Sequence, residues 1–527
     1  MLSAPSRIIV PDMNALMFRV AVASALVVSL AWTTSGPTLL AGGANDQVQP
    51  KLARTSDGGF CLAWFDNATG GYDVRANRFN GSGQPAWGAN GVLVADRSFS
   101  STVDYGAAVV SGDRFAVAYN DDRSGSDRIS VTLLASDGSA LWTSTMVTGS
   151  DYVGNPKVCE DPVSGGIYAA WLQGTTTRVQ RLDVTTGAPV WSTAVNLTDG
   201  TAQTPPADLW PAADASGGVM MSCVRQTGFS SAKLLRAFRV SPSGVVGWTA
   251  GSTAPINVMT SGSLQFGNYP PCAAVPGVGY VFAWYTTSPL QCVVQVLGLD
   301  GAPRFPAGGV AVTATANVER VGPAFAVNAQ ADRIYVAWAD HVPSSSIYGM
   351  GAQAFALSGS GSRLWGEGGL ALQPQGTLYS TDFVAVACDA GGANFHWQSS
   401  TAFGADVLRA RRLSPAGADL FAAGTVQVAP SSDKGRMAAI MQSNASVTVW
   451  QDGATGSTDI RGQRVANDGT VGGNPVRPGD VDGDGFVNGV DITALLAAWG
   501  TDSSAADFNL DGTVDGSDMT FVLSNWD

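Results

Sequence analysis

Oxygen-bearing side chains recur at every second position in a short stretch near the C-terminus, residues 480–491, which reads DVDGDGFVNGVD. Gly485 follows the third of them, where a tight loop must turn sharply. A hard cation such as Ca²⁺ collects six to eight oxygen ligands from alternate residues of such a loop. We therefore predict a Ca²⁺ site whose ligands are Asp480, Asp482, Asp484, the backbone carbonyl of Phe486, Asn488 and Asp491.

The same arrangement returns 27 residues later, in residues 507–518, which read DFNLDGTVDGSD around Gly512. The pattern predicts a second Ca²⁺ ion, bound by Asp507, Asn509, Asp511, the backbone carbonyl of Thr513, Asp515 and Asp518. Each loop leads into a short amphipathic segment, 492–499 or 519–526, whose apolar residues lie at helical spacing and end on a Trp. The sequence thus predicts a small domain of two loop-helix units.

Two such loops, each with Asp at its twelfth position and each followed by a single helix, resemble a type I dockerin over residues 478–527. The resemblance implies that both loops fold on Ca²⁺ and that the module docks onto a cohesin domain, usually in assemblies concerned with polysaccharide breakdown. Partner choice in that family depends on positions 10 and 11 of each loop. Here these are Gly489–Val490 and Gly516–Ser517, which depart from the hydroxyl pairs common in cellulosomal modules. A terminal cap held together by Ca²⁺, with no partner, is the alternative.

Negative charge is concentrated in this C-terminal segment. The 527-residue chain has a net charge of −13 and only 13% charged residues, and residues 479–527 hold ten Asp and no Glu, Lys or Arg. The remainder carries 29 basic and 32 acidic side chains, a net charge of about −3. A nearly neutral body without clustered Lys or Arg argues against nucleic acid as a partner, because phosphate binding needs such clusters.

The rest of the chain is a repeat of about 55 residues, in which segments such as GGFCLAWFD (58–66) and DRIYVAWAD (332–340) align on one position. That position is occupied by Trp64, Tyr119, Trp171, Cys223, Trp284, Trp338, Trp397 and Trp450. A second mark is a Gly followed four residues later by an aromatic: Gly83/Trp87, Gly138/Trp142, Gly187/Trp191, Gly244/Trp248, Gly301/Phe305, Gly361/Trp365 and Gly417/Phe421. The eighth unit breaks this second mark, with Gly473 where an aromatic is due.

Each unit contains four apolar segments bounded by turns, which predicts four antiparallel strands. Four-stranded units at this period are typical of a β-propeller. We predict a mainly β protein: a propeller of eight blades, with seven as the alternative, over residues 37–475, a linker at 476–479 and a small α calcium-binding dockerin-like domain at 480–527. The eighth unit stops before its outer strand, so we expect the segment PTLLAG (37–42) to pair with it and close the ring. Units such as GSGQPAWGANGVLV (81–94) are similar to those of a loosely characterised class of secreted bacterial repeat proteins.

The N-terminus has the composition of a secretory leader. Arg19 precedes the apolar run 20–31, which is too short to span a bilayer comfortably but has the length of a signal-peptide core. We predict a signal peptide over residues 1–31, cleaved after the small residues 29–31, with cleavage after 42–44 as the second choice. The protein is therefore expected to be secreted or associated with the cell surface. No later segment has 18 uninterrupted apolar residues, so no membrane span is predicted.

Two further features bear on export. Residues 1–12 are unlike the beginning of a leader, so translation from Met13 or Met17, leaving residues 1–12 untranslated, is an alternative start. Six cysteines are too few for a dense disulfide framework in a chain of this size, and we predict buried free thiols. Cys272 and Cys292 share one unit but fall on strands two apart, too far for a bridge.

The propeller carries little material for catalysis. His341 and His396 are the only histidines, so neither a Ser-His-Asp triad nor a His-rich metal site is expected. His396 occupies a strand position that holds Ala, Ser or Val in the other seven units, and we predict a packed, hydrogen-bonded histidine. Three hairpin loops, 66–73, 121–127 and 452–459, place Asp at both ends around a Gly. Turn geometry is the better explanation of these loops, and a surface Ca²⁺ site is the alternative.

Function should lie where units depart from the repeat, namely in unit four, with Cys223 and Arg225, and in unit seven, with His396. We predict an exported protein whose C-terminal module binds two Ca²⁺ ions and a cohesin-type partner, and we favour binding over catalysis as its role. Its propeller would bind an extracellular glycan or protein. The alternatives are a polysaccharide-degrading enzyme, an O-glycosyl hydrolase or lyase with catalysis in the propeller, and a structural surface protein.

Overall fold

The fold is that of a computed structural model. It describes residues 32–98, 105–122, 127–148, 151–198, 200, 202–228, 230–248, 251, 253–265, 270–328, 330–377, 380–442, 444–473, 479–481, 487–501, 506, 508 and 513–526. Among these residues, no helix is both long and apolar enough to cross a membrane.

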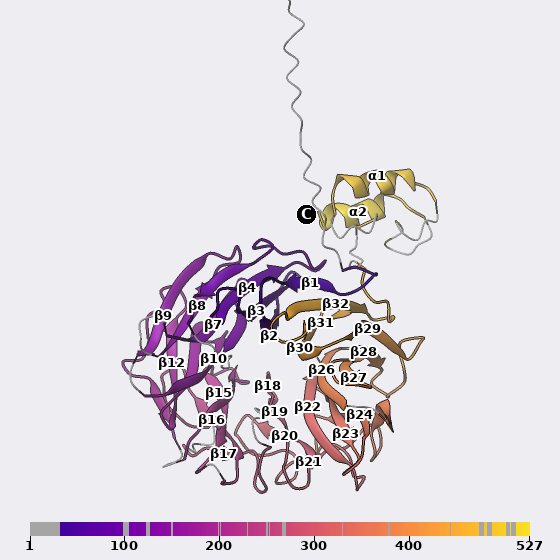
Figure 1. The fold of residues 1–527 in the computed structure, drawn as a ribbon. Helices are drawn as coiled ribbons and strands as arrows, with labels where there is room; N and C mark the ends of the chain where they lie inside the picture. Colours follow the sequence, from indigo (N-terminus) through magenta and orange to yellow (C-terminus); the bar gives the residue numbers. More distant parts are fainter. Residues whose placement is uncertain are drawn as a thin grey trace, which may run out of the picture.

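The repeat folds into eight antiparallel four-stranded sheets, numbered here as blades in chain order (Figure 1). Blade 1 is β2 (Gln47–Arg54), β3 (Phe60–Asp66), β4 (Asp73–Phe79) and β5 (Val92–Ala95), and blade 2 is β6 (Gly106–Val110), β7 (Arg114–Asp121), β8 (Arg128–Leu134) and β9 (Ala140–Thr148). Blade 3 is β10 (Val153–Asp161), β11 (Gly166–Gln173), β12 (Thr176–Asp183) and β13 (Val195–Leu197), and blade 4 is β14 (Pro206–Pro211), β15 (Val219–Arg225), β16 (Leu234–Val240) and β17 (Ile256–Asn257). Blade 5 is β18 (Cys272–Val275), β19 (Gly279–Tyr285), β20 (Cys292–Gly298) and β21 (Val310–Ala311). Blade 6 is β22 (Glu319–Val327), β23 (Arg333–His341), β24 (Ile347–Ala356) and β25 (Leu370–Thr377). Blade 7 is β26 (Ser380–Asp389), β27 (Gly392–Ser400), β28 (Asp406–Leu413) and β29 (Thr425–Ser432). Blade 8 is β30 (Lys434–Met441), β31 (Ala445–Asp452), β32 (Asp459–Ala466) and β1 (Thr38–Ala41). The predicted eight-bladed propeller is confirmed, and the seven-bladed alternative is wrong.

The first strand of each blade lies at the centre of the ring, where first strands of neighbouring blades contact one another (Figure 1). The aromatic mark of each unit falls on the second strand, and Trp64, Trp171 and Trp338 are at most 2% exposed. Apolar clusters fill the space between successive blades, which is how a ring of sheets buries both faces of each sheet. All six cysteines are free, and five of them are buried, as predicted.

The second mark of the repeat joins each blade to the next. A Cβ added to Gly138 of blade 2 would lie 2.7 Å from the ring of Trp87 of blade 1, and the φ of Gly138 is +86°. The same indole Nε1 donates a hydrogen bond to the carbonyl of Ser136 at 2.9 Å. Glycine is required here for two reasons, the left-handed backbone and the close approach of the aromatic ring. Equivalent contacts join Trp142 to Gly187, Trp191 to Gly244, Trp248 to Gly301, Phe305 to Gly361, Trp365 to Gly417 and Phe421 to Gly469.

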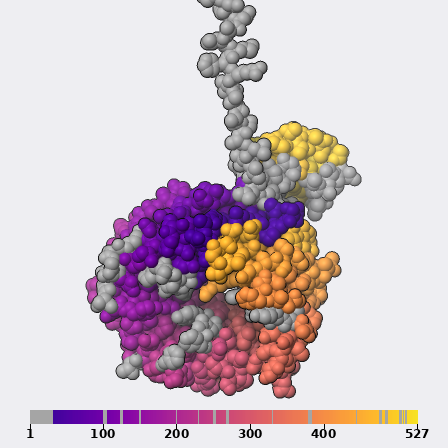
Figure 2. Space-filling model, viewed as in Figure 1, coloured from indigo at the N-terminus to yellow at the C-terminus, as the bar shows by residue number. Residues whose placement is uncertain are grey.

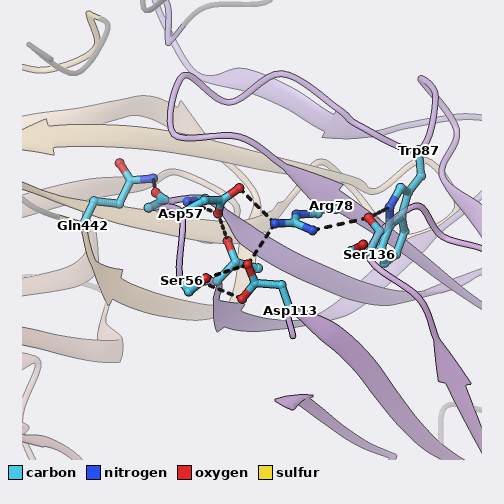
Figure 3. Close-up of polar contacts among 10 residues, drawn as sticks. Ser56, Asp57, Arg78, Trp87, Asp113, Ser136 and Gln442 are labelled. Atoms are coloured by element: carbon cyan, nitrogen blue, oxygen red, sulfur yellow. Dashed lines mark hydrogen bonds and ion pairs between the residues drawn. The ribbon is translucent and has the colours of Figure 1, made fainter. Parts of the chain in front are cut away.

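Charged groups add to this joint between blades 1 and 2 (Figure 3). Arg78 pairs with Asp57 of its own blade at 2.9 Å and with Asp113 of blade 2 at 3.1 Å. Its other nitrogen donates to the carbonyl of Ser136, which also accepts from the indole of blade 1. Gln442 of blade 8 donates to the carbonyl of the turn before β3 at 3.0 Å. Three consecutive blades are therefore linked on one face of the ring.

The ring closes through the N-terminal segment. β1 pairs antiparallel with β32, with Thr38 opposite Gly462 and Ala41 opposite Ile460. Figure 2 shows this N-terminal segment, in indigo, lying against the orange and yellow strands of blade 8. The closure predicted from the missing outer strand of the eighth unit is confirmed, and it leaves that blade without an exposed edge on β32.

Two helices follow the propeller, α1 (Gly489–Ala497) and α2 (Gly516–Ser524). Both begin three residues before the segments expected from apolar spacing, 492–499 and 519–526. The reason is local: the residues before the helices supply N-caps, so the first turn forms ahead of the first buried apolar residue.

Candidate functional site

The twelfth residue of each C-terminal loop closes that loop through the same two hydrogen bonds. Its two carboxylate oxygens accept one from the backbone N–H of position 2 and one from that of position 9. The four bonds are Val481 to Asp491 Oδ1 (2.8 Å), Asn488 to Asp491 Oδ2 (2.8 Å), Phe508 to Asp518 Oδ1 (2.7 Å) and Asp515 to Asp518 Oδ2 (2.9 Å). Asp491 and Asp518 are fully buried. Within the described residues, positions 2, 9 and 12 of the two loops are therefore arranged in the same way.

The ninth residue of each loop starts the following helix. Asn488 is the N-cap of α1 and accepts from the N–H of Val490 at 2.8 Å, and Asp515 is the N-cap of α2 and accepts from the N–H of Ser517 at 2.7 Å. The position-12 aspartate completes a capping box with each of them. Loop closure and helix initiation therefore depend on the same side chains.

Six of the twelve predicted Ca²⁺ ligands lie within the described residues, and three of these have buried carboxylates: Asp480 at 5% exposed, and Asp491 and Asp518 at 0%. The described ligands are Asp480, Asn488, Asp491, Thr513, Asp515 and Asp518. The predicted ligands outside the described residues are Asp482, Asp484, Phe486, Asp507, Asn509 and Asp511. Buried carboxylates in a segment without Lys or Arg are the donor chemistry of a hard cation, so Ca²⁺ fits the residues present.

The two loop-helix units share one small core. Val487 and Val514, at position 8 of their loops, are fully buried with Leu495 of α1 and Val522 of α2. Val514 also exchanges backbone hydrogen bonds with the segment after α1, accepting from the N–H of Gly500 at 2.9 Å. The two units are therefore one folding module.

Residues 478–524 match the family model described as the dockerin type I domain. The C-terminal module is a type I dockerin. Dockerins typically bind cohesins and generally bind calcium, and the oxygen donors of the two loops agree with calcium. No curated protein sequence matches the chain.

Solved structures similar to the propeller include a PL25 polysaccharide lyase, ulvan lyase, at 10% identity, covering 82% of this chain and 96% of that chain with a TM-score of 0.43. The Dos1 propeller is 9% identical, with 82% and 95% covered and a TM-score of 0.46. The WD40 domain of SCAP from fission yeast is 6% identical, with 82% and 94% covered and a TM-score of 0.42. At these identities none of them transfers an activity to this chain.

The dockerin exposes large apolar side chains at equivalent positions of its two units. Leu496 and Trp499 of the first unit are 53% and 47% exposed, and Leu523 and Trp526, each 27 positions later, are 59% and 48% exposed. Val490, at position 11 of the first loop, is also exposed. Apolar residues that recur in register on a small module are available to a protein partner.

In the propeller both histidines are engaged in packing. His396 is fully buried, its Nε2 lies 2.9 Å from Ser446 Oγ of blade 8, and burial lowers the pKa of His396 to about 3. His341 contacts Glu319 Oε2 and the carbonyl of Ser345, each at 2.9 Å. The carbonyl contact, and then the carboxylate, raise the pKa of His341. The prediction of a packed, hydrogen-bonded His396 is confirmed.

The other departures of units four and seven are also structural. Cys223 is fully buried in the apolar cluster between blades 3 and 4, where it takes the place of an aromatic. Arg225 ends β15 and is half-buried. Sequence departure from the repeat thus marks altered packing at these positions rather than a cluster of reactive groups.

Carboxylates of the Asp-rich hairpin loops make hydrogen bonds and ion pairs with residues of their own hairpins. Asp66 accepts from the N–H of Ala68 at 2.9 Å and pairs with Arg75 on the facing strand at 2.8 Å. Asp452 pairs with Arg461 at 3.2 Å in the same way. In the loop 121–127, residues 123–126 lie outside the described residues. These contacts favour the turn interpretation over a surface cation.

One charged sector of the inner strands was missed at the sequence level. Lys51, Lys157 and Asp208 occupy equivalent positions of blades 1, 3 and 4, each paired with the residue before the aromatic mark of the second strand. Before each lysine the strand bulges at a residue with positive φ that precedes a proline, +57° at Gln49 and +53° at Asn155. The repeated tripeptides QPK and NPK are the sequence signal that could have revealed it. Bulges of this kind redirect side chains and are frequent beside functional sites.

Side chains of the charged sector interact with neighbouring blades. Lys51 lies over the ring of Tyr105 of blade 2, with its Nζ 4.9 Å from the ring centroid. Asp208 accepts from the indole of Trp210 at 2.8 Å and lies 3.7 Å from the thiol of Cys272 of blade 5. Burial raises the pKa of Asp208, opposed by the charge of Lys157 and then by the Trp210 hydrogen bond. The sector combines cationic, acidic and aromatic groups where other blades carry Gly, Pro or Ala.

Inner-strand carboxylates are all engaged among the side chains that the structure describes. Besides Asp208, Glu319 contacts His341, and Asp389 pairs with Arg412 at 2.7 Å. The remaining two, on β10, accept hydrogen bonds from residues of blades 2 and 4: Glu160 from Ser111, and Asp161 from Gly218. Glu160, Asp161 and Asp389 thereby join neighbouring blades, the last by accepting from Asn467 of blade 8, whereas the Glu319 contact lies within blade 6. These acids have structural partners, whereas a glycoside hydrolase needs two acids that face each other across a cleft.

Proposed function

We propose that this is an exported display protein, whose dockerin binds two Ca²⁺ ions and docks onto a cohesin-type partner while its propeller binds an extracellular glycan or protein. The observation that carries the proposal is the duplicated loop geometry, in which Asp491 and Asp518 make the same two hydrogen bonds. A module built twice in the same way, with exposed apolar residues at equivalent positions, supports binding rather than catalysis as its role.

Calcium would be held in each loop by the carboxylates and amide of positions 1, 3, 5, 9 and 12 and by the carbonyl of position 7. When bound, each ion supplies the positive charge that offsets mutual repulsion among the ten Asp residues of the segment. Asp491 and Asp518 position the backbone of loop positions 2 and 9 by accepting hydrogen bonds from their N–H groups. Folding of the module and binding of the ions are therefore expected to be coupled.

Titration calorimetry on the whole chain tests the two calcium ions. We expect two ions per chain, one for Asp480→Ala, and none for Asp480→Ala combined with Asp507→Ala, because each change removes the oxygen donors of the first ligand of one loop. Asp502→Ala is the matched control, since Asp502 lies between the two twelve-residue loops and should leave both ions in place. Binding of two ions by the double variant would contradict the ligand assignment.

The docking surface can be tested with purified type I cohesin domains. Binding of the whole chain should require Ca²⁺ and should fall when Leu496 and Leu523 are both changed to Asp, because a buried charge without a partner is costly at an interface. Changing Leu93, an equally exposed leucine on the propeller, to Asp is the control and should leave binding intact. Calcium-dependent binding by neither protein would favour a terminal cap with no partner.

The charged sector of blades 1, 3 and 4 is the first place to examine for ligand binding by the propeller. Glycan arrays and a surface-protein pull-down with the whole chain should give a ligand whose binding weakens in Lys51→Ala. Because the sector is cationic at blades 1 and 3, we expect acidic ligands to dominate. Release of reducing ends or of unsaturated uronyl ends from a polysaccharide panel would instead favour the enzyme alternative.

A further inference from the structure

The N-terminal segment supplies two features of the eighth blade, an aromatic residue and an outer strand. The eighth repeat unit has Gly473 at the position of the second aromatic mark, and the outer strand of its blade is β1 from the N-terminal segment. Trp32 takes the place of that aromatic: it is 1% exposed, its Nε1 donates to the carbonyl of Gly81 at 2.9 Å, and a Cβ on Gly83 would lie 2.9 Å from its ring. These are the contacts that Trp87 makes with the turn of blade 2.

The equivalence extends to the residue after the aromatic. In blade 5 the amide of Gln295 donates to the carbonyl of Pro306, and in blade 6 that of Gln353 donates to the carbonyl of Gly366. In each case the acceptor directly follows the aromatic mark. In blade 8 the amide of Gln463 donates to the carbonyl of Thr33 at 2.9 Å, directly after Trp32.

The two chain segments meet without spare room at this point. The N–H of Gly473 donates to the carbonyl of Trp32 at 2.7 Å, and a Cβ on Gly472 would lie 2.1 Å from the carbonyl oxygen of Thr33. The segment from Trp32 to Ala41, here called the strap, therefore begins where the eighth unit ends. Trp32, Thr33 and the strand β1 have counterparts in the other blades, namely the aromatic mark, the residue after it and the outer strand.

We propose that export processing cuts the peptide bond between Ala31 and Trp32, so that the mature chain begins with Trp32 and keeps the aromatic and the outer strand that complete the eighth blade. Water adds across this bond, leaving the carboxylate on Ala31 and the amine on Trp32, and the reaction is that of an export-associated endopeptidase acting after small residues. Ser29 and Ala31 provide those small residues directly after the apolar run.

The second candidate cleavage, after Ala44, is incompatible with the closed ring. It would remove Trp32 and all of β1, expose the edge of β32 along Ile460 to Gly462, and uncover the face of Phe60, on which the indole stacks at 6.1 Å. An exposed strand edge is a template for pairing between chains. The closed fold thus selects one of the two small-residue sites.

The test is intact mass and N-terminal sequencing of the exported protein. We expect a single product beginning Trp-Thr-Thr-Ser. In Ala31→Leu this product should be lost, since a bulky residue replaces the small one next to the bond, whereas Ala44→Leu should leave the N-terminus unchanged. A wild-type product beginning at Asn45, or one shifted by Ala44→Leu and not by Ala31→Leu, would overturn the assignment.

A second measurement separates the role of the strap from the choice of bond. Chains produced without a leader and starting at Trp32 or at Asn45 should differ, the shorter one melting at lower temperature or forming aggregates. Trp32→Ala in the longer chain should lower the melting temperature as well. Equal melting of both chains as monomers would show that the ring does not need the strap and would remove the reason for placing the cut at Trp32.

Discussion

Lowering the pH should weaken the joint between blades 7 and 8 through His396. The imidazole is fully buried against Ser446, and its Nδ1 has no hydrogen-bond partner in the part of the chain that the structure describes. Burial lowers the pKa of His396 from 6.5 to about 3, because the charged imidazolium loses its hydration there.

The sign follows from the two states. The unfolded chain takes up a proton on His396 below pH 6.5, while the folded chain resists it until about pH 3, so stability is lost as the pH falls through this window. Between pH 7 and pH 5 the loss amounts to about 2 kcal/mol, from pKa values of 6.5 and about 3. His341 acts in the opposite sense, since its pKa is raised on folding and its contribution is lost as the pH rises.

Urea unfolding at pH 5 and pH 7 measures this effect. His396→Gln removes the titration while keeping an amide that can reach Ser446, so its loss of unfolding free energy between the two pH values should be smaller than that of the wild type by about 2 kcal/mol. Absolute stability at pH 7 is not the readout, because the substitution also changes packing. His341→Gln is the control and should not diminish the acid loss. If His396→Gln and the wild type lose the same free energy between pH 7 and pH 5, the reasoning from burial is wrong.

Three further outcomes are expected. Gly138→Ala should lower the free energy of unfolding by about 1–3 kcal/mol more than Gly58→Ala. Both glycines have positive φ, but only at Gly138 would the added methyl group meet the ring of Trp87. Equal losses would contradict the role of the second mark in joining one blade to the next. Arg78→Ala should lower the free energy of unfolding, and the size of this loss should depend only weakly on salt concentration, because the two ion pairs of Arg78 with carboxylates are partly buried. A melting temperature unchanged from wild type would show that these ion pairs do not stabilise the fold. Chelation should abolish the calorimetric transition of the dockerin and leave that of the propeller in place; a dockerin transition that survives chelator would refute coupled folding.

Local sequence patterns were sufficient to predict much of the architecture. The aromatic mark at Trp64 and its equivalents, with turns at regular spacing, predicted strands and their number per unit, because apolar alternation and turn residues act within a few positions of each other. The C-terminal dockerin could be recognised for the same reason, since one tight loop carries all the predicted donors, while the individual Ca²⁺ ligands stay predictions. The helices of the dockerin were placed three residues late because apolar spacing ignores the N-caps Asn488 and Asp515.

The sequence by itself determined a repeat of four-stranded units and a C-terminal type I dockerin. Only the tertiary structure decided that Trp32 completes a blade whose other strands lie some 400 residues away, that Lys51, Lys157 and Asp208 share one level of the ring, and that His396 meets Ser446 across a joint. The sequence predicted that residues 37–42 pair with the eighth unit, but no local pattern identified Trp32 as the aromatic of that blade or Ser446 as the partner of His396. Their neighbours are fixed by closure of the ring, a long-range condition satisfied only when all eight blades have buried their faces against one another.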